Sequence, residues 1–149
     1  MKNPKKTQKE PKMVFQIRAI ELLELNMHQP IQPLSDQTTF HYNISLEQKA
    51  ISESKLVIII ATIQIIHEDK ETRLASIKAS CIFEVENFAD FIVEDPQDVN
   101  LPEILSTSLN SITLSTVRGL MFSSLKGTFL HNAILPVIDP KSLVKTVQE

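Results

Sequence analysis

The segment between residues 75 and 86 places the strongest constraint on the fold, because apolar and polar side chains alternate along it. A repeat of two residues is typical of a β-strand with one buried and one exposed face. The apolar face would carry Ala75, Ile77, Ala79, Cys81, Phe83 and Val85, and the polar face Ser76, Lys78, Ser80, Glu84 and Glu86. The pattern predicts a long strand that covers a core on one side.

Three earlier segments are also predicted to be strands. The first runs from Phe15 to about Pro30, the second alternates from Thr39 to Glu47, and the third covers Lys55–Glu68 and is apolar on both faces in its first half, as in a central strand. A turn at Glu68–Glu71 joins the third strand to the fourth, which predicts a hairpin and an antiparallel sheet. In the first strand, one face is expected to carry Phe15, Ile17, Ala19, Leu23, Leu25 and Met27.

A long helix is predicted from Leu101 to Lys126, with Pro102 in its first turn and Gly127 just after its last. Two apolar stripes run along it, one through Ile104, Leu105, Leu109, Ile112 and Leu120, the other through Leu114, Val117, Met121 and Leu125. One sheet covers one stripe, so the second predicts a partner subunit. The expected oligomer interface is Leu105, Leu109, Ile112, Leu114, Val117 and Met121.

The remaining segments complete an α+β architecture. Residues Asn87–Asn100 are expected to form a loop, and a short helix is expected after Pro140, through Leu143 and Val144. The predicted fold is a four-stranded antiparallel sheet with the long helix and the short C-terminal helix packed on one face. Residues 13–149 would form this single domain, preceded by a disordered basic tail at residues 1–12.

The charges of the chain are unevenly placed. Five of its 15 Lys and Arg residues and one of its 18 Asp and Glu residues lie within residues 1–12, so the body is acidic. The net charge of −3 predicts no nucleic-acid partner, although a functional basic arm is an alternative interpretation of the tail. We see no signal peptide and no apolar run long enough to span a membrane, and the single cysteine fits a reducing cytoplasm.

Signatures of catalysis or cofactor binding are missing from the sequence. Its two glycines, Gly119 and Gly127, are too few for a phosphate-binding loop. None of the four histidines is spaced for metal binding, and Cys81 is expected to be a small core residue rather than a nucleophile. We therefore expect no enzyme, no cofactor and no metal, while an enzyme assembled from distant residues stays open as an alternative.

Apolar side chains in the Asn87–Asn100 loop have two interpretations. They could plug one end of the sheet as core, or they could line a groove for an apolar ligand. The residues concerned are Phe88, Phe91, Ile92 and Val93.

Two motifs resemble the SecB family of bacterial protein-export chaperones. Residues 15–30 (FQIRAIELLELNMHQP) match the first strand of that family, with its FQI-x-x-I pattern and closing proline. Residues 126–137 (KGTFLHNAILPV) match the RGTF-like motif that ends the long helix of the family, followed by its Pro-Val pair. The resemblance extends from about Phe15 to Val144, in the same order of strands, crossover loop and helices.

The resemblance implies a cytoplasmic, ATP-independent holdase that binds unfolded or precursor polypeptides. It implies a dimer of dimers, in which sheets join through their first strands and long helices pack between dimers. The client groove would lie between the crossover loop and the second strand, which carries Phe40, Tyr42, Ile44 and Leu46.

The partners implied by the family are of two kinds. Members that pass clients to the SecA-type translocase motor have acidic docking positions, of which Glu24 keeps one, whereas His28 and Ser76 stand at two others. Other members protect an antitoxin. A small-ligand or lipid-binding α+β domain, with the long helix closing over the sheet, is the alternative function.

Overall fold

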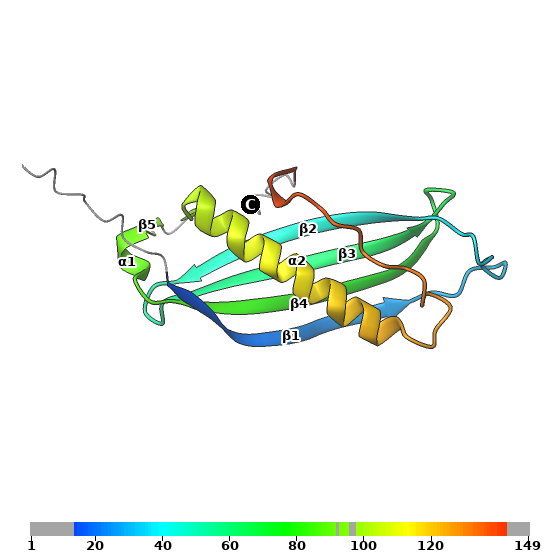
Figure 1. Ribbon diagram of the computed structural model, residues 1–149, viewed down its shortest axis with the longest axis horizontal. Coiled ribbons are helices and arrows are strands. Elements are labelled where there is room, and N and C mark those ends of the chain that lie inside the picture. The colour runs from blue at the N-terminus through cyan, green and yellow to red at the C-terminus, as the bar shows by residue number, and fades with distance from the viewer. Residues whose placement is uncertain (1–13, 92, 96–97, 143–149) are drawn as a thin grey trace, which may run out of the picture.

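The computed structural model describes residues 14–91, 93–95 and 98–142, with the backbone alone for those between 90 and 100 and for residue 142. A four-stranded sheet and one long helix dominate it (Figure 1). The elements are β1 (Phe15–Met27), β2 (Phe40–Ile51), β3 (Leu56–His67), β4 (Arg73–Val85), α1 (Phe88–Phe91), β5 (Val93–Asp95), β6 (Asp98–Asn100), α2 (Glu103–Leu125) and a 3₁₀ turn, η1 (Pro140–Ser142).

The four long strands form one antiparallel sheet in the order β1-β4-β3-β2, which confirms the four predicted strands and their orientation. Asp69 closes the predicted turn between β3 and β4. Its carboxylate accepts hydrogen bonds from the backbone N–H groups of Glu71 and Thr72 and from the Thr72 hydroxyl. These bonds favour the ionised carboxylate and lower the pKa of Asp69 to about 2.

The predicted face of β1 is wrong in the middle of the strand. The register of β1 against β4 shifts between Ile17 and Ala19 and again between Leu22 and Glu24. Each shift inserts a residue and moves the following side chains to the other face. Register partners of the buried β4 residues therefore share the core face, and these are Phe15, Ile17, Ile20, Leu22, Leu25 and Met27.

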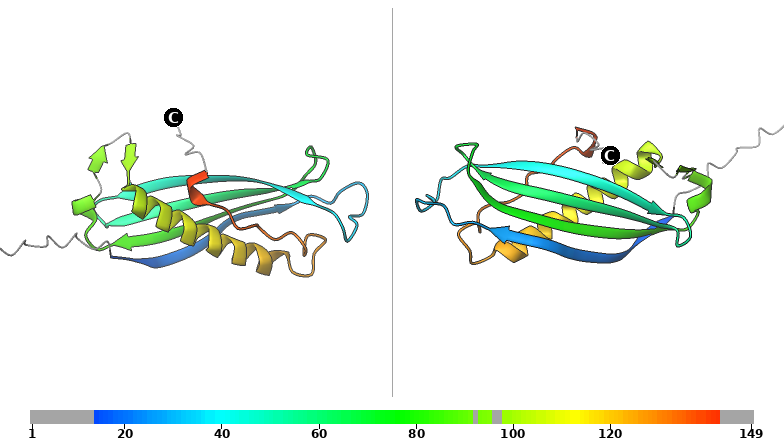
Figure 2. Two further views of the ribbon diagram at one scale, coloured as in Figure 1. Left: turned by 45° about the horizontal axis from the view of Figure 1, so that its top comes forward. Right: turned by 180° about the vertical axis from the view of Figure 1, so that it is seen from behind.

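Helix α2 lies diagonally across one face of the sheet, which we call the inner face (Figures 1 and 2). The helix ends as predicted, because Gly127 adopts a φ of 78° and the Thr128 N–H donates to the Leu125 carbonyl. Hydroxyls that would otherwise be buried without a partner are satisfied locally, since Thr113 and Thr116 donate to the carbonyls of Leu109 and Ile112.

After α2 the chain returns beside the helix, on the side of β2, as a segment that we call the strap, residues 127–140 (Figures 1 and 2). Leu130, Ala133 and Leu135 of the strap are buried in the common core. The Arg118 guanidinium holds the strap to α2, with Nε donating to the Leu135 carbonyl and Nη2 to the Pro136 carbonyl, both at 2.8 Å. The apolar sequence after the helix is therefore part of the core of the subunit.

Two predicted segments differ from the structure. The expected loop at Asn87–Asn100 contains the short helix α1 and a two-stranded hairpin of β5 and β6. The second C-terminal helix is not seen, because the described chain after Pro140 holds only the turn η1, and Leu143 and Val144 lie outside the described residues. The predicted basic tail, residues 1–12, also lies outside them.

Candidate functional site

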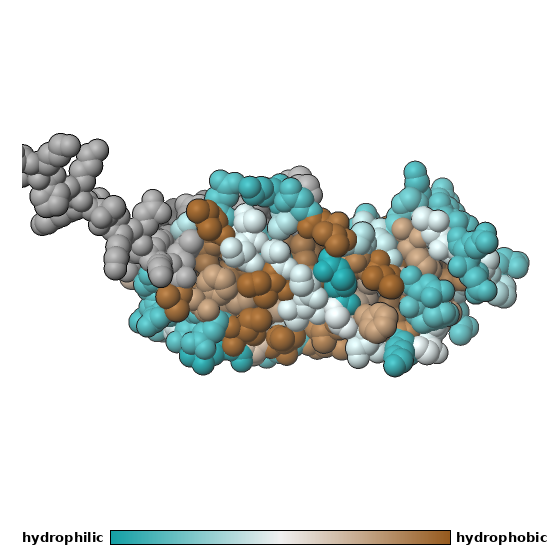
Figure 3. All heavy atoms as spheres, in the orientation of Figure 1, coloured by the Kyte–Doolittle hydropathy of each residue, from teal (hydrophilic) through white to brown (hydrophobic). Residues whose placement is uncertain are grey.

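The inner face of β1 carries apolar side chains that α2 leaves uncovered. Ile20 and Leu22 are each 47% exposed, although both face the core side of the sheet. Helix α2 packs over β3 and β4 instead, so the surface of β1 beside it is apolar and open (Figure 3). We call this surface the β1 patch, and its members are Ile17, Ile20, Leu22 and Met27.

The backbone of β1 is also open on one side. Strand β1 pairs only with β4 in the described part of the sheet, so its other edge presents unpaired N–H and C=O groups. An apolar side-chain surface beside a free strand edge is a template for strand addition by another polypeptide. The sequence pattern predicted the strand but not the patch. A strict alternation leaves Ile20 and Leu22 off the apolar face, whereas the two register shifts place them on the inner face.

The predicted client residues of β2 lie on the inner face but are more enclosed. Phe40, Tyr42 and Ile44 are half-buried, and Leu46 is only 8% exposed. Burial raises the pKa of the Tyr42 phenol, because desolvation disfavours its charged form. The first three side chains are therefore accessible in part, whereas Leu46 belongs to the core.

Strand β2 is tied to α2 by a polar contact inside this region. The Gln48 side-chain amide donates to the Ser106 hydroxyl at 2.7 Å and to the side-chain oxygen Oδ1 of Asn110 at 3.0 Å. Both acceptors are buried in the face of α2 that meets the sheet. Because a buried polar group without a partner is costly, these bonds fix the helix over β2.

The predicted loop residues of the client site are placed only in part. Phe88 is 3% exposed and packs in the core, which agrees with the first of the two interpretations of this loop. Phe91 and Val93 are described by their backbone alone, in α1 and β5, and Ile92 lies outside the described residues. Their role as client contacts stays a prediction.

The predicted interface residues of α2 mostly face the sheet of their own subunit. Five of the six, namely Leu105, Leu109, Leu114, Val117 and Met121, are buried, and Ile112 is partly exposed. Most residues of the two stripes are buried within one subunit, where Leu130, Ala133 and Leu135 of the strap join the same core, so the stripes by themselves do not require a partner subunit. Any role of these six residues in an interface stays a prediction.

The solvent face of α2 carries different residues. Small residues occupy the exposed middle of the helix, namely Ser111, Ser115 and Gly119. A side chain added at Gly119 would meet no atom within 4 Å, so the helix leaves room for a close neighbour here. Ile104 is 72% exposed and Phe122 is 54% exposed at the two ends.

Residues considered for docking and for chemistry lie apart. Glu24 is exposed on the outer face of β1, where its carboxylate accepts a hydrogen bond from the Asn26 amide. Cys81 is buried as predicted, and burial raises the pKa of its thiol, which therefore stays protonated at neutral pH. In the described ranges, no three His, Cys, Asp or Glu side chains are grouped to hold a metal ion. No helix in those ranges has the length and hydropathy of a membrane span.

Comparison with known proteins gives a fold. Neither a protein-family model nor a curated protein sequence matches the chain. Among solved structures, the chain is similar to a SecB-like chaperone from Mycobacterium tuberculosis, solved in complex with a ChAD peptide from the HigA1 antitoxin, with a TM-score of 0.56 and 14% identity over 83% of this chain and 90% of that one. A protein of unknown function from Streptococcus agalactiae is similar with a TM-score of 0.43 and 13% identity over 78% and 90%. At 14% identity the first similarity concerns the fold alone, and the fold of this chain is SecB-like.

Proposed function

We propose that this protein is an ATP-independent cytoplasmic chaperone, a holdase that binds unfolded polypeptides without performing chemistry on them. The observation that carries the proposal is the row of half-buried apolar side chains, Phe40, Tyr42 and Ile44, beside the unpaired edge of β2. Unfolded chains expose apolar side chains together with free backbone groups, and a surface of this kind meets both needs. The SecB-like fold supports the proposal, because the similar chaperone was solved with a peptide from an antitoxin.

The client is proposed to bind at the second edge of the sheet, along β2. There the half-buried side chains of Phe40, Tyr42 and Ile44 lie next to a free strand edge, and β6 contacts the same strand towards its C-terminal end (Figure 1). A client strand added to β2 would form sequence-independent backbone hydrogen bonds and place alternate side chains against these three residues. The crossover residues Phe91, Ile92 and Val93 would border the same groove, and the client would be an antitoxin or an export precursor.

Assembly is proposed to use the other edge. Two copies would join through their β1 edges, which buries the β1 patch and removes two free edges at once. Two such dimers would pack through the solvent faces of α2, where Ser111, Ser115 and Gly119 permit close approach. Docking of a SecA-type motor is the less supported partner proposal, because Glu24 alone keeps an acidic docking position while His28 and Ser76 are uncharged or weakly basic.

Light scattering of an unrelated unfolded protein tests the proposed function. The wild-type protein should suppress aggregation at near-stoichiometric amounts without nucleotide. Tyr42→Ser together with Ile44→Ser should reduce this suppression, whereas Ile31→Ser, which removes a fully exposed apolar side chain from the loop between β1 and β2, should not. Absence of suppression by the wild type would refute the proposal, and a co-purified small molecule would then favour the ligand-binding alternative.

A further inference from the structure

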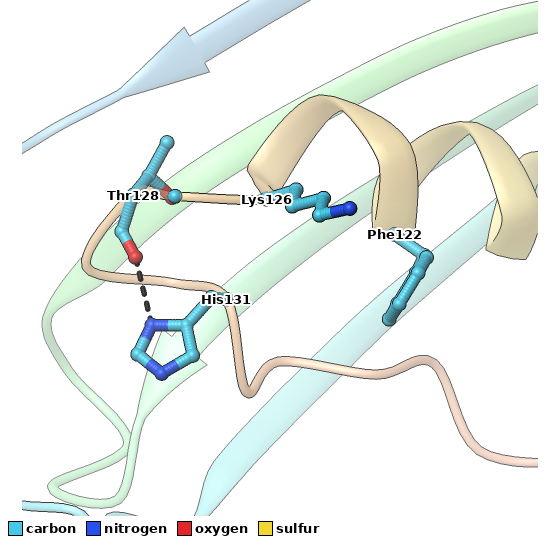
Figure 4. A pocket seen from close by; sticks show the side chains of 5 residues that line it. Phe122, Lys126, Thr128 and His131 are labelled. Atoms are coloured by element: carbon cyan, nitrogen blue, oxygen red, sulfur yellow. Dashed lines mark hydrogen bonds between the residues drawn. The ribbon is translucent and has the colours of Figure 1, made fainter.

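A pocket of about 550 Å³ opens at the C-terminal end of α2, apart from both strand edges. We call it the α2-end pocket. Its lining comes from the last turns of the helix and from the start of the strap, which the turn at Gly127 brings together (Figure 4). The lining residues are Phe122, Lys126, Gly127, Thr128 and His131.

Hydrogen-bond acceptors around this pocket are already occupied within the chain. The Leu125 carbonyl accepts from the N–H and the hydroxyl of Thr128, and the Thr128 hydroxyl oxygen accepts from the Leu130 N–H. The Thr128 carbonyl accepts from the N–H of His131 and from its Nδ1 at 2.9 Å (Figure 4). Since a carbonyl can only accept, Nδ1 carries the proton, and Nε2 is the ring nitrogen left for a ligand.

The chain segment that lines the pocket carries basic residues and no carboxylate. The sequence from Ile104 to Ile138 contains no Asp or Glu, although the body of the protein is acidic. Arg118 is engaged with the strap carbonyls, whereas Lys126 forms no salt bridge within the described residues. The C-terminal dipole of α2 opposes an anion by about half a charge, but the full charge of Lys126 and the two donors on the Leu125 carbonyl outweigh it.

The apolar part of the pocket is the ring of Phe122, which is 54% exposed. An aromatic ring left half in water beside an unpaired ammonium group suits a ligand that is apolar on one side and negatively charged on the other. An apolar partner alone would leave Lys126 without a counter-charge, and an acidic partner alone would leave the ring uncovered.

We propose that the α2-end pocket binds a carboxylate that neighbours an apolar side chain in a client polypeptide. Lys126 pairs with the carboxylate, Phe122 packs against the neighbouring side chain, and His131 Nε2 accepts an N–H of the client backbone. The carboxylate comes either from Asp or Glu or from the carboxyl terminus of the client. The ligand class rests on the proposed chaperone function, while the site itself does not.

Fluorescence anisotropy with short labelled peptides tests this inference. Three probes in a Gly-Ser background carry Glu-Phe-Glu, Gln-Phe-Gln or Lys-Phe-Lys. Two further peptides end in Phe, one as the free acid and the other as the C-terminal amide. The wild type should prefer Glu-Phe-Glu over Gln-Phe-Gln by about fivefold, a preference that salt weakens, since a partly exposed ion pair contributes modestly. Tighter binding of the free-acid peptide than of the C-terminal amide identifies the carboxyl terminus as a source of the carboxylate.

Variants on the surface separate the contributions. Lys126→Met should abolish the preference for the acidic peptide, and Lys126→Arg should keep it. Phe122→Ala should weaken the binding of the Glu-Phe-Glu and Gln-Phe-Gln peptides by a similar factor, about tenfold at most, as for a partly exposed aromatic contact. Lys70→Met, which removes an exposed cation in the turn between β3 and β4, is the matched control and should change nothing.

Several outcomes would overturn the inference. Equal affinity of the wild type for the Glu-Phe-Glu and the Gln-Phe-Gln peptide excludes a carboxylate site. A preference for Glu-Phe-Glu that survives in Lys126→Met excludes the proposed role of Lys126. A change of assembly state in Phe122→Ala, with unchanged peptide affinity, assigns the ring to a contact between subunits. Suppression of aggregation without acidic-peptide preference refutes the pocket alone, whereas the reverse result refutes the chaperone function alone.

Discussion

Strands β1 and β2 are the two edges of one sheet, yet they differ in how much of their inner face is covered. They have similar lengths, 13 and 12 residues, and both alternate apolar and polar side chains over part of their length. On the inner face, β2 places Leu46 in the core, whereas β1 leaves Ile20 and Leu22 half in water. The difference lies in what covers each strand.

The cover over β2 comes from the protein's own chain. Helix α2 crosses the sheet diagonally, and the strap runs beside it on the β2 side (Figures 1 and 2). Gln48 bonds β2 to the helix, and Arg118 bonds the helix to the strap. No comparable segment lies over β1 in the described chain, so its apolar face is left for another molecule.

Strand β1 also differs in how it is held to its neighbour. Its pairing with β4 contains two register shifts, and an exposed ion pair between Arg18 and Glu84 crosses the two strands on the outer face. The pairing of β2 with β3 has no such shift. On the inner face, therefore, β2 is covered by its own chain and β1 is not, and the proposed assembly through β1 would supply the cover that this strand lacks.

The largest expected effect comes from placing a charge on each strand. Leu46→Asp should lower the free energy of unfolding by about 4 kcal/mol or more, because it removes a buried side chain and desolvates a carboxylate. Leu22→Asp should cost the isolated subunit less than about 1 kcal/mol, because water reaches this side chain in the subunit. Chemical denaturation measures both.

Light scattering adds the second half of this comparison. Leu22→Asp should dissociate an oligomer that joins through β1 while leaving a folded subunit. Equal destabilisation by the two substitutions would show that β1 is covered as fully as β2, and a wild type that is monomeric at micromolar concentration would refute assembly through β1.

A polar substitution should separate the strands next. Gln48→Leu leaves the buried Ser106 hydroxyl and Asn110 carbonyl oxygen without their donor, which should cost about 1–3 kcal/mol in the free energy of unfolding. The matched change on β1, Gln16→Leu, lies at an exposed position and should stay within about 0.5 kcal/mol. Urea denaturation measures the difference, provided that the unfolding free energy of each variant depends on urea concentration with the same slope. If Gln48→Leu leaves the free energy of unfolding unchanged, water replaces the lost donor.

Loosening the strap should make the covered side more like the open side. Arg118→Met removes two charge-assisted bonds to partly exposed carbonyls and should cost about 1 kcal/mol. Tyr42 is the only tyrosine and tryptophan is absent, so its absorbance reports on β2 directly. Burial raises its pKa, so a loosened strap should let it ionise at lower pH than in the wild type.

The control for this experiment is Arg73→Met, an exposed arginine at the start of β4 that no strap residue contacts through a hydrogen bond in the described chain. Spectrophotometric titration of both variants follows Tyr42. An unchanged titration in Arg118→Met would show that the strap does not contribute to the burial of β2.

The smallest effect concerns pH. The Arg18 guanidinium beside Glu84 lowers the pKa of that carboxyl, so the pair stabilises the folded state above the ordinary pKa of Glu. This contribution is lost as the pH falls through the lowered folded-state pKa. Amides of β1 should therefore lose hydrogen-exchange protection in acid before those of β2, whose contact to α2 through Gln48 is uncharged.

Arg18→Gln provides the check on this last prediction. In the variant, the pKa of Glu84 measured by NMR should rise towards its ordinary value, and the acid sensitivity of β1 should decrease. Acid exchange that is equal in β1 and β2 of the wild type would contradict the proposed difference.

Local patterns account for most elements of the fold. Alternation at residues 75–86 and the apolar run in β3 specify strands wherever they are placed, because a period of two matches only the pleat. Gly127 marks the end of α2 because few other residues adopt its positive φ. The expected C-terminal helix is not seen, since the described chain after Pro140 holds only the turn η1.

The candidate site was harder to predict, as three cases illustrate. Ile20 and Leu22 were left out of the predicted apolar face because a β-bulge leaves no mark in the alternation of β1. Leu46 was grouped with Phe40 and Tyr42 because all three share a parity, although only Leu46 lies under full cover. Burial of a face depends on which other segment crosses it, and a single-strand pattern does not contain that information.

The sequence by itself determined the strands of the sheet, their antiparallel pairing through the Glu68–Glu71 turn, the extent of α2 and the burial of Cys81. These features depend on contacts between residues near one another along the chain or on the period of one element. Only the tertiary structure decided that the strap and α2 cover the side of β2 and leave β1 open. That outcome depends on the diagonal path of α2 and on the contact between Arg118 and the strap, which join segments that the sequence pattern treats separately.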